Sequence, residues 1–335
     1  MVWLKFTLCL IIILFAGTRL ARYGDAIAEK TGLGGIWIGL VLLAAITSVP
    51  ELVTGISSVA LVKLPDLALG DLLGSCIFNL TLIALLDILY RRGPVLSQAS
   101  SRHVMSAGLG ILLSAVVVGG ILAGGRFPGL TLGWVSVPSI LPLVLYIAGV
   151  WWIFRSERSY RLQPIEAISP QYKDIPIRTV YLRFALAAIS VIGAGIWLSF
   201  IGDEIASTYA WQASFVGSLF LAITTSVPEL VVTIAALRLG AIDMAIADIL
   251  GSNMFNIAIV TPVDLAYRPG SLLSRVSSVH LMTAVVTIVM SLLVIVGLRF
   301  RQKRKAFGII SWYTPVLIGL YIFGIYALFK GISLG

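Results

Sequence analysis

The sequence predicts an all-α integral membrane protein of ten transmembrane helices, arranged as two inverted five-helix repeats. Three observations carry this prediction: 59% of the 335 residues are hydrophobic and only 12% are charged, the apolar residues form long continuous runs, and two polar motifs each occur twice. A soluble domain is about 45–50% apolar and about 25% charged. Continuous apolar runs of about 20 residues fit membrane helices, whereas the strands of a membrane barrel alternate in polarity.

The same composition excludes several classes of protein. A water-soluble fold has too little interior to hide this many apolar residues, which argues against a soluble enzyme. The net charge of +9 does not indicate nucleic-acid binding, because the basic residues lie between the apolar runs, where they act as topology signals. Cys9 and Cys76 lie inside apolar runs and predict buried thiols rather than a disulfide framework. The lipid bilayer is therefore the expected surroundings.

The apolar runs place ten spans in order along the chain. They cover residues 3–22, 34–62, 66–89, 103–124 and 131–154 in the first half, and 179–202, 211–238, 242–264, 277–298 and 309–329 in the second half. The first run has no small-residue cleavage site directly after it, so we expect a span rather than a signal peptide. The predicted domains are a first repeat over 1–154, a polar linker over 155–178 and a second repeat over 179–335.

The basic residues between the spans predict the orientation of the chain. Of the 24 lysines and arginines, 18 fall on one side when the spans are taken alternately. Cytoplasmic loops carry an excess of these residues. That side, with the 155–178 linker, is therefore predicted to be cytoplasmic, both termini are expected outside, and the protein is expected to be a multi-pass protein of the cell membrane.

Two duplicated motifs relate the halves. Thr-Ser-Val-Pro-Glu-Leu-Val occurs at 47–53 and at 225–231, and Asp-x-Leu-Gly-Ser-x-x-Phe-Asn occurs at 71–79 and at 248–256. Both motifs lie within residues 45–80 of the first half and 222–257 of the second half, and their nearly constant offset indicates a duplication. Because each half has an odd number of predicted spans, the second copy is inverted across the membrane.

Each copy of the first motif interrupts a span. Pro50 and Pro228 lie in the middle of apolar runs, where proline removes a helical hydrogen bond. The carbonyls that are freed one turn earlier can face a cation. Interrupted helices at matching positions of inverted repeats are a pointer to the midplane site of a transporter.

The polar side chains near these interruptions are candidate cation ligands. Glu51 and Glu229 lie deep in apolar spans, where a charged carboxylate costs about 2.5–3.5 kcal/mol or more, and together they neutralise a hard dication that prefers oxygen ligands. Hydroxyl and amide oxygens complete the candidate set: Thr47, Ser48, Ser75, Asn79, Thr225, Ser226, Ser252 and Asn256. The structural alternatives are hydroxyls bonded to a carbonyl one turn earlier and asparagines that join neighbouring helices.

Two further acids precede the serines of the second motif by four residues. Asp71 and Asp248 therefore share a helix face with Ser75 and Ser252, about one turn nearer the membrane surface. We expect them either to line an access pathway to the site or to cap the start of their helices, where acids are favoured. No histidine or cysteine stands at the spacing of a zinc or copper site, and no cofactor is expected.

The doubled motifs resemble the two alpha repeats of the calcium/cation antiporter superfamily, and the whole chain is similar to prokaryotic sodium/calcium exchangers. The resemblance implies a secondary active antiporter that exchanges Ca²⁺ for Na⁺ while outer helices slide past a core. It implies Ca²⁺ bound by Glu51 and Glu229, with backbone carbonyls from Thr47 and Thr225. It further implies flanking sodium sites that use Ser48, Ser75, Ser226 and Ser252, and a centre that Asn79 and Asn256 complete.

The sequence departs from this family at a few positions and leaves the transported ions open. Asn256 stands where some sodium-coupled relatives have an acid, whereas Asp71, Asp248 and Cys76 stand where the family usually has asparagine. Proton-coupled antiport of Ca²⁺, or of another divalent cation, is therefore the alternative. Inorganic cations are the expected partners in either case, and no obligate protein partner is evident.

Three other functions fit the sequence less well. An intramembrane aspartyl protease needs a Gly-x-Gly-Asp setting, but Ala68 stands at the first glycine position before Asp71, and Asp248 follows Ala247. A passive cation channel does not need inverted repeats with interrupted helices. A calcium-regulated binding protein requires a loop such as the EF-hand, and the sequence contains no such loop.

Overall fold

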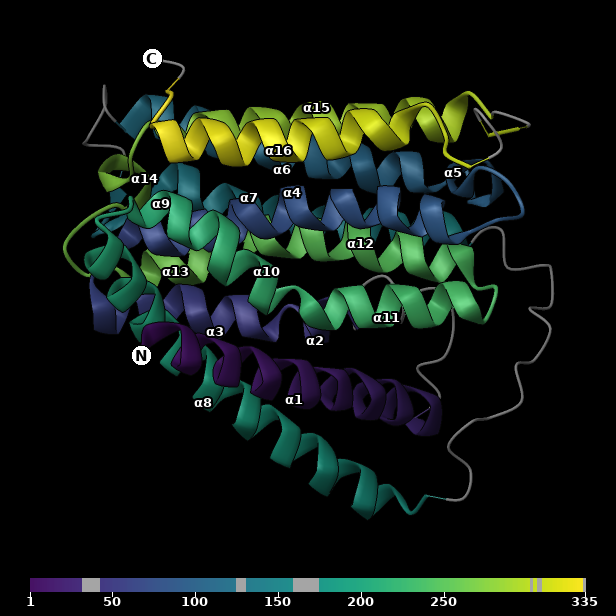
Figure 1. The fold of residues 1–335 in the computed structure, drawn as a ribbon, viewed down its shortest axis with the longest axis horizontal. Coiled ribbons are helices and arrows are strands. Elements are labelled where there is room, and N and C mark those ends of the chain that lie inside the picture. The colour runs from purple at the N-terminus through teal and green to yellow at the C-terminus, as the bar shows by residue number, and fades with distance from the viewer. Residues whose placement is uncertain (32–42, 125–130, 159–174, 302–303, 306–308, 334–335) are drawn as a thin grey trace.

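A computed structural model of the chain describes residues 1–31, 43–124, 131–158, 175–301, 304–305 and 309–333. Within these ranges, seven helices are long and apolar enough to cross a membrane, and a bent pair of helices adds an eighth span if it is counted as one. Both ends of the chain lie at the same end of the molecule (Figure 1), as an even number of crossings requires. The total of ten spans stays a prediction.

The first half is helical nearly throughout the residues that are described. Its elements are α1 (Val2–Thr31), α2 (Ala44–Thr47), α3 (Val49–Ser57), the π-helical turn η2 (Ser58–Val62), α4 (Pro65–Leu89), α5 (Val95–Gln98), α6 (His103–Gly124), β1 (Thr131–Leu132), β2 (Val135–Ser136) and α7 (Val137–Arg158). Residues 34–42 of the predicted second span lie outside the described ranges. The predicted span 131–154 begins too early, because Gly133 adopts a φ of 67° and turns β1 back onto β2 in an antiparallel pair.

The second half is also helical in nearly all of its described residues, but its π-helical turn precedes the helix break rather than following it. Its elements are α8 (Ile177–Tyr209), α9 (Ala213–Val216), the π-helical turn η3 (Gly217–Leu221), α10 (Ala222–Thr225), α11 (Val227–Arg238), α12 (Ile242–Ala258), α13 (Val260–Ala266), α14 (Leu272–Arg275), α15 (Val279–Arg299) and α16 (Tyr313–Lys330). In Figure 1, α1 and α8 run in opposite directions, as do α3 and α11. These directions agree with the predicted inversion of the second copy. Most of the predicted linker, residues 159–174, lies outside the described ranges.

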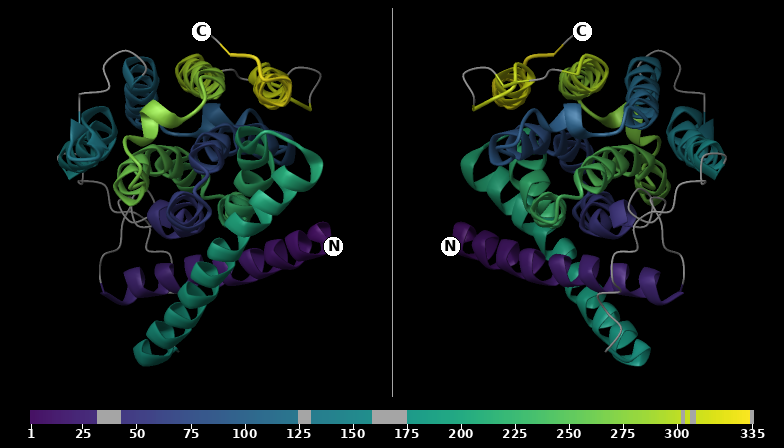
Figure 2. Two further views of the ribbon diagram at one scale, coloured as in Figure 1. Left: turned by 90° about the vertical axis from the view of Figure 1, so that its left-hand side faces the viewer. Right: turned by 90° about the vertical axis from the view of Figure 1, so that its right-hand side faces the viewer.

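The helices surround a central pair. Figure 2 shows α4 and α12 in the middle of the bundle, with α6, α7, α15 and α16 around them on one side. On the other side, α1 and α8 pack against each other and cross beneath the bundle, where they contact α11 and α3. On this side of the bundle α1 and α8 are the outermost helices. The broken helices with the first motif lie between them and the central pair, which carries the second motif.

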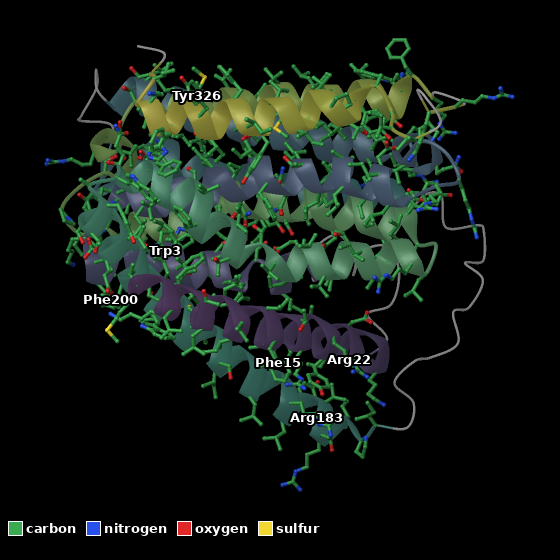
Figure 3. All side chains as sticks on the ribbon, in the orientation of Figure 1. Trp3, Phe15, Arg22, Arg183, Phe200 and Tyr326 are labelled. Carbon is green, nitrogen blue, oxygen red and sulfur yellow. The ribbon has the colours of Figure 1, made fainter. Side chains whose placement is uncertain are left out.

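Large apolar side chains cover the outer surface. Figure 3 shows Phe15, Phe200 and Tyr326 on α1, α8 and α16, and their side chains are 47–59% exposed. Exposed aromatic and aliphatic groups on this scale cost free energy in water, whereas in lipid they are at no disadvantage. Arg22 and Arg183 lie toward the opposite end of the molecule from Trp3 (Figure 3), which is the end predicted to be cytoplasmic.

Two histidine–aspartate contacts join the halves at matched positions. The Nε2 atom of His280 lies 3.0 Å from Oδ1 of Asp66, and Nε2 of His103 lies 3.0 Å from Oδ1 of Asp243. Each aspartate also accepts a backbone N–H from the segment before the histidine, from Ser277 and from Ser100 respectively. Each acid lies in the first turn of a central helix of one half and hydrogen-bonds to the other half. Two such contacts therefore connect the repeats.

A buried carboxylate on α4 forms hydrogen bonds that connect this helix to α5 and to the start of α16. Asp87 is fully buried and accepts the backbone N–H groups of Val95 and Ser311 at 3.0 and 2.8 Å. It also accepts hydroxyls from Ser311, Tyr313 and Thr314, each at 2.8 Å. The N–H of Val95 lies in the first turn of α5, where a carboxylate is favoured by the helix dipole.

Asp87→Ala is expected to destabilise the protein strongly. The substitution leaves several buried donors without an acceptor, and each costs about 1–3 kcal/mol. The thermal midpoint of the purified protein in detergent should fall well below that of the wild type. Asp203→Ala, which removes an exposed acid of α8, is the control and should leave the midpoint unchanged. Equal midpoints for the two variants would show that the Asp87 network does not hold α16 in place.

Candidate cation site

The two interrupted helices break in the same way. One ends at Thr47 and resumes at Val49, the other ends at Thr225 and resumes at Val227, and the intervening Ser48 and Ser226 share a φ of −87° and ψ values of 12° and 10°. In the second half the axis bends by 44°. The prolines follow at the second position of each new helix, where a missing N–H is tolerated. The predicted interruption of both spans is confirmed.

Each break reaches the acid of the other half. The Ser48 hydroxyl donates to Oε1 of Glu229 at 3.0 Å, and the Ser226 hydroxyl donates to Oε1 of Glu51 at 2.9 Å. All four side chains are completely buried. The two contacts are reciprocal, because each joins the serine of one half to the glutamate of the other half. Both halves are therefore needed to form this arrangement.

The threonines and the serines of the second motif form a second reciprocal set. The hydroxyl oxygens of Thr47 and Ser252 lie 3.4 Å apart, as do those of Thr225 and Ser75. The hydroxyl oxygens of Thr47 and Thr225 also lie 3.1 Å from carbonyl oxygens of the preceding turn, which is the structural alternative for these hydroxyls. They therefore do both: they bond within their own helix and face the opposite half.

Many polar atoms of this buried cluster have no hydrogen-bond partner among the residues that the structure describes. They are Oε2 of Glu51, Oε2 of Glu229, Oδ2 of Asp71, both carboxylate oxygens of Asp248, and the side-chain amides of Asn79 and Asn256. These residues are fully buried. Buried polar groups are nearly always hydrogen-bonded, and a set that is not points to an ion or ligand. A group of bare oxygens that includes several carboxyl groups suits a cation.

Asp71 and Asp248 do not lie where a helix cap lies. α4 begins at Pro65 and α12 at Ile242, so both acids are in the second turn of their helices, and both are fully buried. Oδ1 of Asp71 accepts the hydroxyl of Thr225 at 3.0 Å. The structure therefore joins Asp71 directly to the predicted site, and the capping alternative is wrong.

The asparagines and one cysteine extend the site along the central helices. Asn79 and Asn256 stand one turn beyond Ser75 and Ser252 on the same helix faces. Between them, Cys76 and its counterpart Asn253 contact each other: the thiol lies 3.7 Å from the Asn253 carbonyl, and the Asn253 amide donates to the Cys76 carbonyl at 3.2 Å. The duplicated motif contained this pair, but sequence reasoning did not assign it.

Glycines bring the two crossing helices close beside the site. A Cβ atom on Gly74 would lie 2.4 Å from the Ser218 Cα, and one on Gly217 would lie 2.4 Å from the Leu67 carbonyl oxygen. The Ser218 hydroxyl also donates to the Gly70 carbonyl at 3.0 Å. Gly74 therefore allows the close approach of these helices, and the Gly70-x-x-x-Gly74 spacing is typical of such crossings.

The donor set is mixed rather than a cage of carboxylates. Within the described ranges, no three His, Cys, Asp or Glu side chains are grouped so that they alone hold a metal ion. Glu51 and Glu229 lie near each other and near Asp71, with hydroxyls and amides between and beside them. Two acids with neutral oxygens can bind a hard cation and release it, because the number of charged ligands sets the affinity.

Comparisons with known proteins identify the family of this chain. The family model described as sodium/calcium exchanger protein matches residues 1–155 and 179–335. The inner membrane protein YrbG of Escherichia coli is 28% identical over 293 residues, which are 83% of this chain and 84% of that protein. The likeness extends over nearly the whole membrane region.

Two solved structures share the fold. The sodium-calcium exchanger NCX_Mj, soaked with Na⁺ and Sr²⁺, aligns with a TM-score of 0.63 at 21% identity and covers 98% of this chain and 99% of its own. The structure of native YfkE aligns with a TM-score of 0.65 at 19% identity and covers 97% and 92%. Since the family model covers nearly all of the sequence, this chain belongs to the sodium/calcium exchanger protein family of multi-pass membrane cation antiporters.

Proposed function

We propose that this protein exchanges Ca²⁺ for Na⁺ across the cell membrane by alternating access, with its termini outside and its central linker in the cytoplasm. The observation that carries the proposal is the reciprocal pair of bonds from Ser48 to Glu229 and from Ser226 to Glu51. It leaves one free oxygen on each glutamate at the breaks of two inverted helices. Two carboxylates neutralise one Ca²⁺, and no cofactor is required.

Exchange follows from competition for these ligands. Glu51 and Glu229 bind either one Ca²⁺ or the counter-ions, because the same oxygens serve both. An empty site that carries bare carboxylates is costly in a low-dielectric interior, so the change of access proceeds only when the site is loaded. The position of α1 and α8 outside the bundle (Figure 2) supports a movement of this pair past the other helices.

H⁺ is the second candidate for the counter-ion. The observation that favours it is the presence of four fully buried acids, Glu51, Asp71, Glu229 and Asp248, in one region. A protonated carboxyl group is neutral and crosses a low-dielectric region at little cost. The dication is likewise proposed to be Ca²⁺, with other divalent cations as the alternative.

An uptake experiment separates the two coupling ions. Purified protein reconstituted into vesicles should take up ⁴⁵Ca²⁺ when an outward Na⁺ gradient is imposed, and should take up far less under an outward H⁺ gradient. Vesicles without protein are the control. Uptake driven by H⁺ alone would move the protein to proton-coupled exchange, and no Ca²⁺ movement under either gradient would show that another cation is transported. Flux without any counter-ion would indicate a channel.

A further inference from the structure

Two glycines of each outer helix lie against the broken helices. Gly17 and Gly24 in α1 correspond to Gly195 and Gly202 in α8, at the same offset that relates the two copies of the first motif. A Cβ atom added at any of the four would lie only 2.5–3.1 Å from a side chain of another helix. The outer helices therefore contact the broken helices closely at four matched positions, where a larger side chain does not fit.

The contacts of α1 lie at the breaks themselves. A Cβ atom on Gly17 would lie 2.5 Å from Cγ of Pro228, whose ring is in the first turn of α11. A Cβ atom on Gly24 would lie 2.5 Å from Cδ1 of Ile46, next to the last residue of α2. Because a proline ring is rigid, the first of these contacts fixes the position of α1 along α11.

The first contact of α8 lies one turn away from the equivalent position. A strict inversion of the contact of Gly17 would place Gly195 on Pro50. Instead, a Cβ atom on Gly195 would lie 3.1 Å from Cγ1 of Val53 and 3.2 Å from Oγ1 of Thr54. Both residues lie about one helical turn beyond Pro50, toward the end of the molecule at which the two termini lie (Figure 1).

The second contact of α8 is displaced in the same direction. A strict inversion of the contact of Gly24 would place Gly202 on Thr224. Instead, a Cβ atom on Gly202 would lie 2.9 Å from Cδ1 of Leu221, about one turn before Thr224, and 3.2 Å from Leu67 near the start of α4. Two independent contacts therefore show the same displacement of α8.

The packing of whole elements agrees with these contacts. α8 packs on η2 and η3, whereas α1 packs on α2, α10 and α11 around the breaks. α1 and α8 also pack against each other, so they form one unit that is displaced relative to the broken helices. One turn of a helix is about 5.4 Å long, which is therefore the departure of this pair from strict inversion.

We propose that α1 and α8 move together by about one helical turn toward the opposite end of the molecule, and that the movement exchanges the contacts of the two helices. Gly195 then faces Pro50. Gly17 then faces Val231 and Val232, which correspond in the repeat to the present contacts of Gly195. One element can pass another by one turn, about 5.4 Å, when both positions are well packed. The four glycines are the positioning residues that set the two end positions.

The inference rests on the proposed alternating access and deepens it, because it gives the movement a length and two defined end points. In the present position α1 covers Pro228, which directly precedes Glu229. In the other position α8 covers Pro50, which directly precedes Glu51. The covered break thus alternates between the two halves.

The distance between spin labels on Ser207 and Arg238 measures this movement. Ser207 is exposed near the end of α8, and Arg238 is exposed at the far end of α11. Cys9 and Cys76 are buried and do not compete for the label. Pulsed electron resonance on the full chain in lipid nanodiscs should show two distances that differ by about 5 Å. Labels on Ser207 and Arg22, which both lie on the moving pair, should show one unchanged distance.

Two matched alanine variants should shift the two distances in opposite directions. Gly17→Ala overlaps the ring of Pro228 in the present position, so the shorter distance should gain. Gly195→Ala overlaps the ring of Pro50 in the other position, so the longer distance should gain. Overpacking of this kind should change the ratio of the two distances by about tenfold or more. A general loss of stability would not produce opposite shifts.

A rescue variant keeps the test valid if Gly17→Ala does not fold. Gly24→Ala overlaps Cδ1 of Ile46 in the present position and should also favour the shorter distance, to a smaller extent because the end of isoleucine is flexible. Adding Ile46→Val removes Cδ1 and should restore the wild-type ratio. A single distance in the wild type and in all variants would overturn the proposal, as would shifts of Gly17→Ala and Gly195→Ala in the same direction.

Uptake and distance together separate this inference from the proposed exchange. Two distances in a protein that moves no ⁴⁵Ca²⁺ would retain the movement and refute the exchange of Ca²⁺. Exchange of Ca²⁺ for Na⁺ by a protein whose Ser207–Arg238 distance stays single would retain the exchange and refute the movement of the outer pair.

Discussion

Glu229→Gln and Glu51→Gln are each expected to abolish Na⁺-driven Ca²⁺ uptake while leaving the protein folded. Glutamine has the shape of glutamate and retains an oxygen that can accept the hydroxyl of Ser48 or Ser226. It lacks the charge that balances half of a Ca²⁺ ion. Removing one partner of a buried charge interaction costs about 3–5 kcal/mol, so uptake should fall by about 100-fold or more.

The same uptake assay, run beside a stability measurement, makes this result decisive. Glu204→Gln is the matched control, because Glu204 is a partly exposed acid on α8 that pairs with Lys5 at 2.7 Å, and uptake should be retained. Size-exclusion profiles and thermal midpoints of all three variants should resemble those of the wild type. Substantial Ca²⁺ uptake by Glu229→Gln would refute the assignment of the central ligand.

Much of the fold could be predicted because lipid imposes simple rules on sequence. Continuous apolar runs gave the helices near His103–Gly124 and Val279–Arg299 almost to the residue, since a membrane helix must satisfy its own backbone. The rules fail where the backbone is irregular. Turns such as the one at Gly133, and the extension of α1 to Thr31 beyond its apolar run, depend on local packing and on charges near the interface.

The members of the site were predictable, but their pairing was not. A repeated motif with a mid-span proline and a glutamate indicates that both copies serve one site, and the structure brings all ten predicted ligands into the buried interior. Nothing in one sequence says that Ser48 binds Glu229 rather than Glu51. That pairing follows from how the inverted halves cross, which is a property of tertiary packing.

The aspartates illustrate a different limit. Distance along a helix placed Asp71 and Asp248 one turn nearer the surface than the serines, and this was interpreted as an access pathway or a cap. The structure begins these helices at Pro65 and Ile242, close to the predicted positions, and it buries both acids completely in the second turn of each helix. The pairs of Asp66 with His280 and of Asp243 with His103 were also missed, although the same repeat offset relates their members.

Gly74→Ala is expected to impair transport almost as severely as loss of a ligand, although it removes no polar atom. The added Cβ would lie 2.4 Å from the Ser218 Cα and 2.6 Å from its carbonyl oxygen. Both are backbone atoms, so no side-chain rotation relieves the overlap, and α4 must move away from η3. Ser75 is the next residue and faces Thr225 at 3.4 Å. A shift of about 1 Å at such a site costs up to about 100-fold in rate.

A second glycine separates this steric effect from the general properties of alanine. Gly119 on α6 has nothing within 4 Å of the position of an added Cβ. Gly119→Ala should therefore leave ⁴⁵Ca²⁺ uptake unchanged. Its thermal midpoint should stay the same or rise slightly, because alanine favours a helix over glycine by about 1 kcal/mol. Gly217→Ala meets the backbone from the other side, 2.4 Å from the Leu67 carbonyl, and should reproduce the loss seen in Gly74→Ala. If all three variants transport like the wild type, the crossing of α4 and η3 does not determine the positions of the ligands, and the site must tolerate displacement of the helices that carry them.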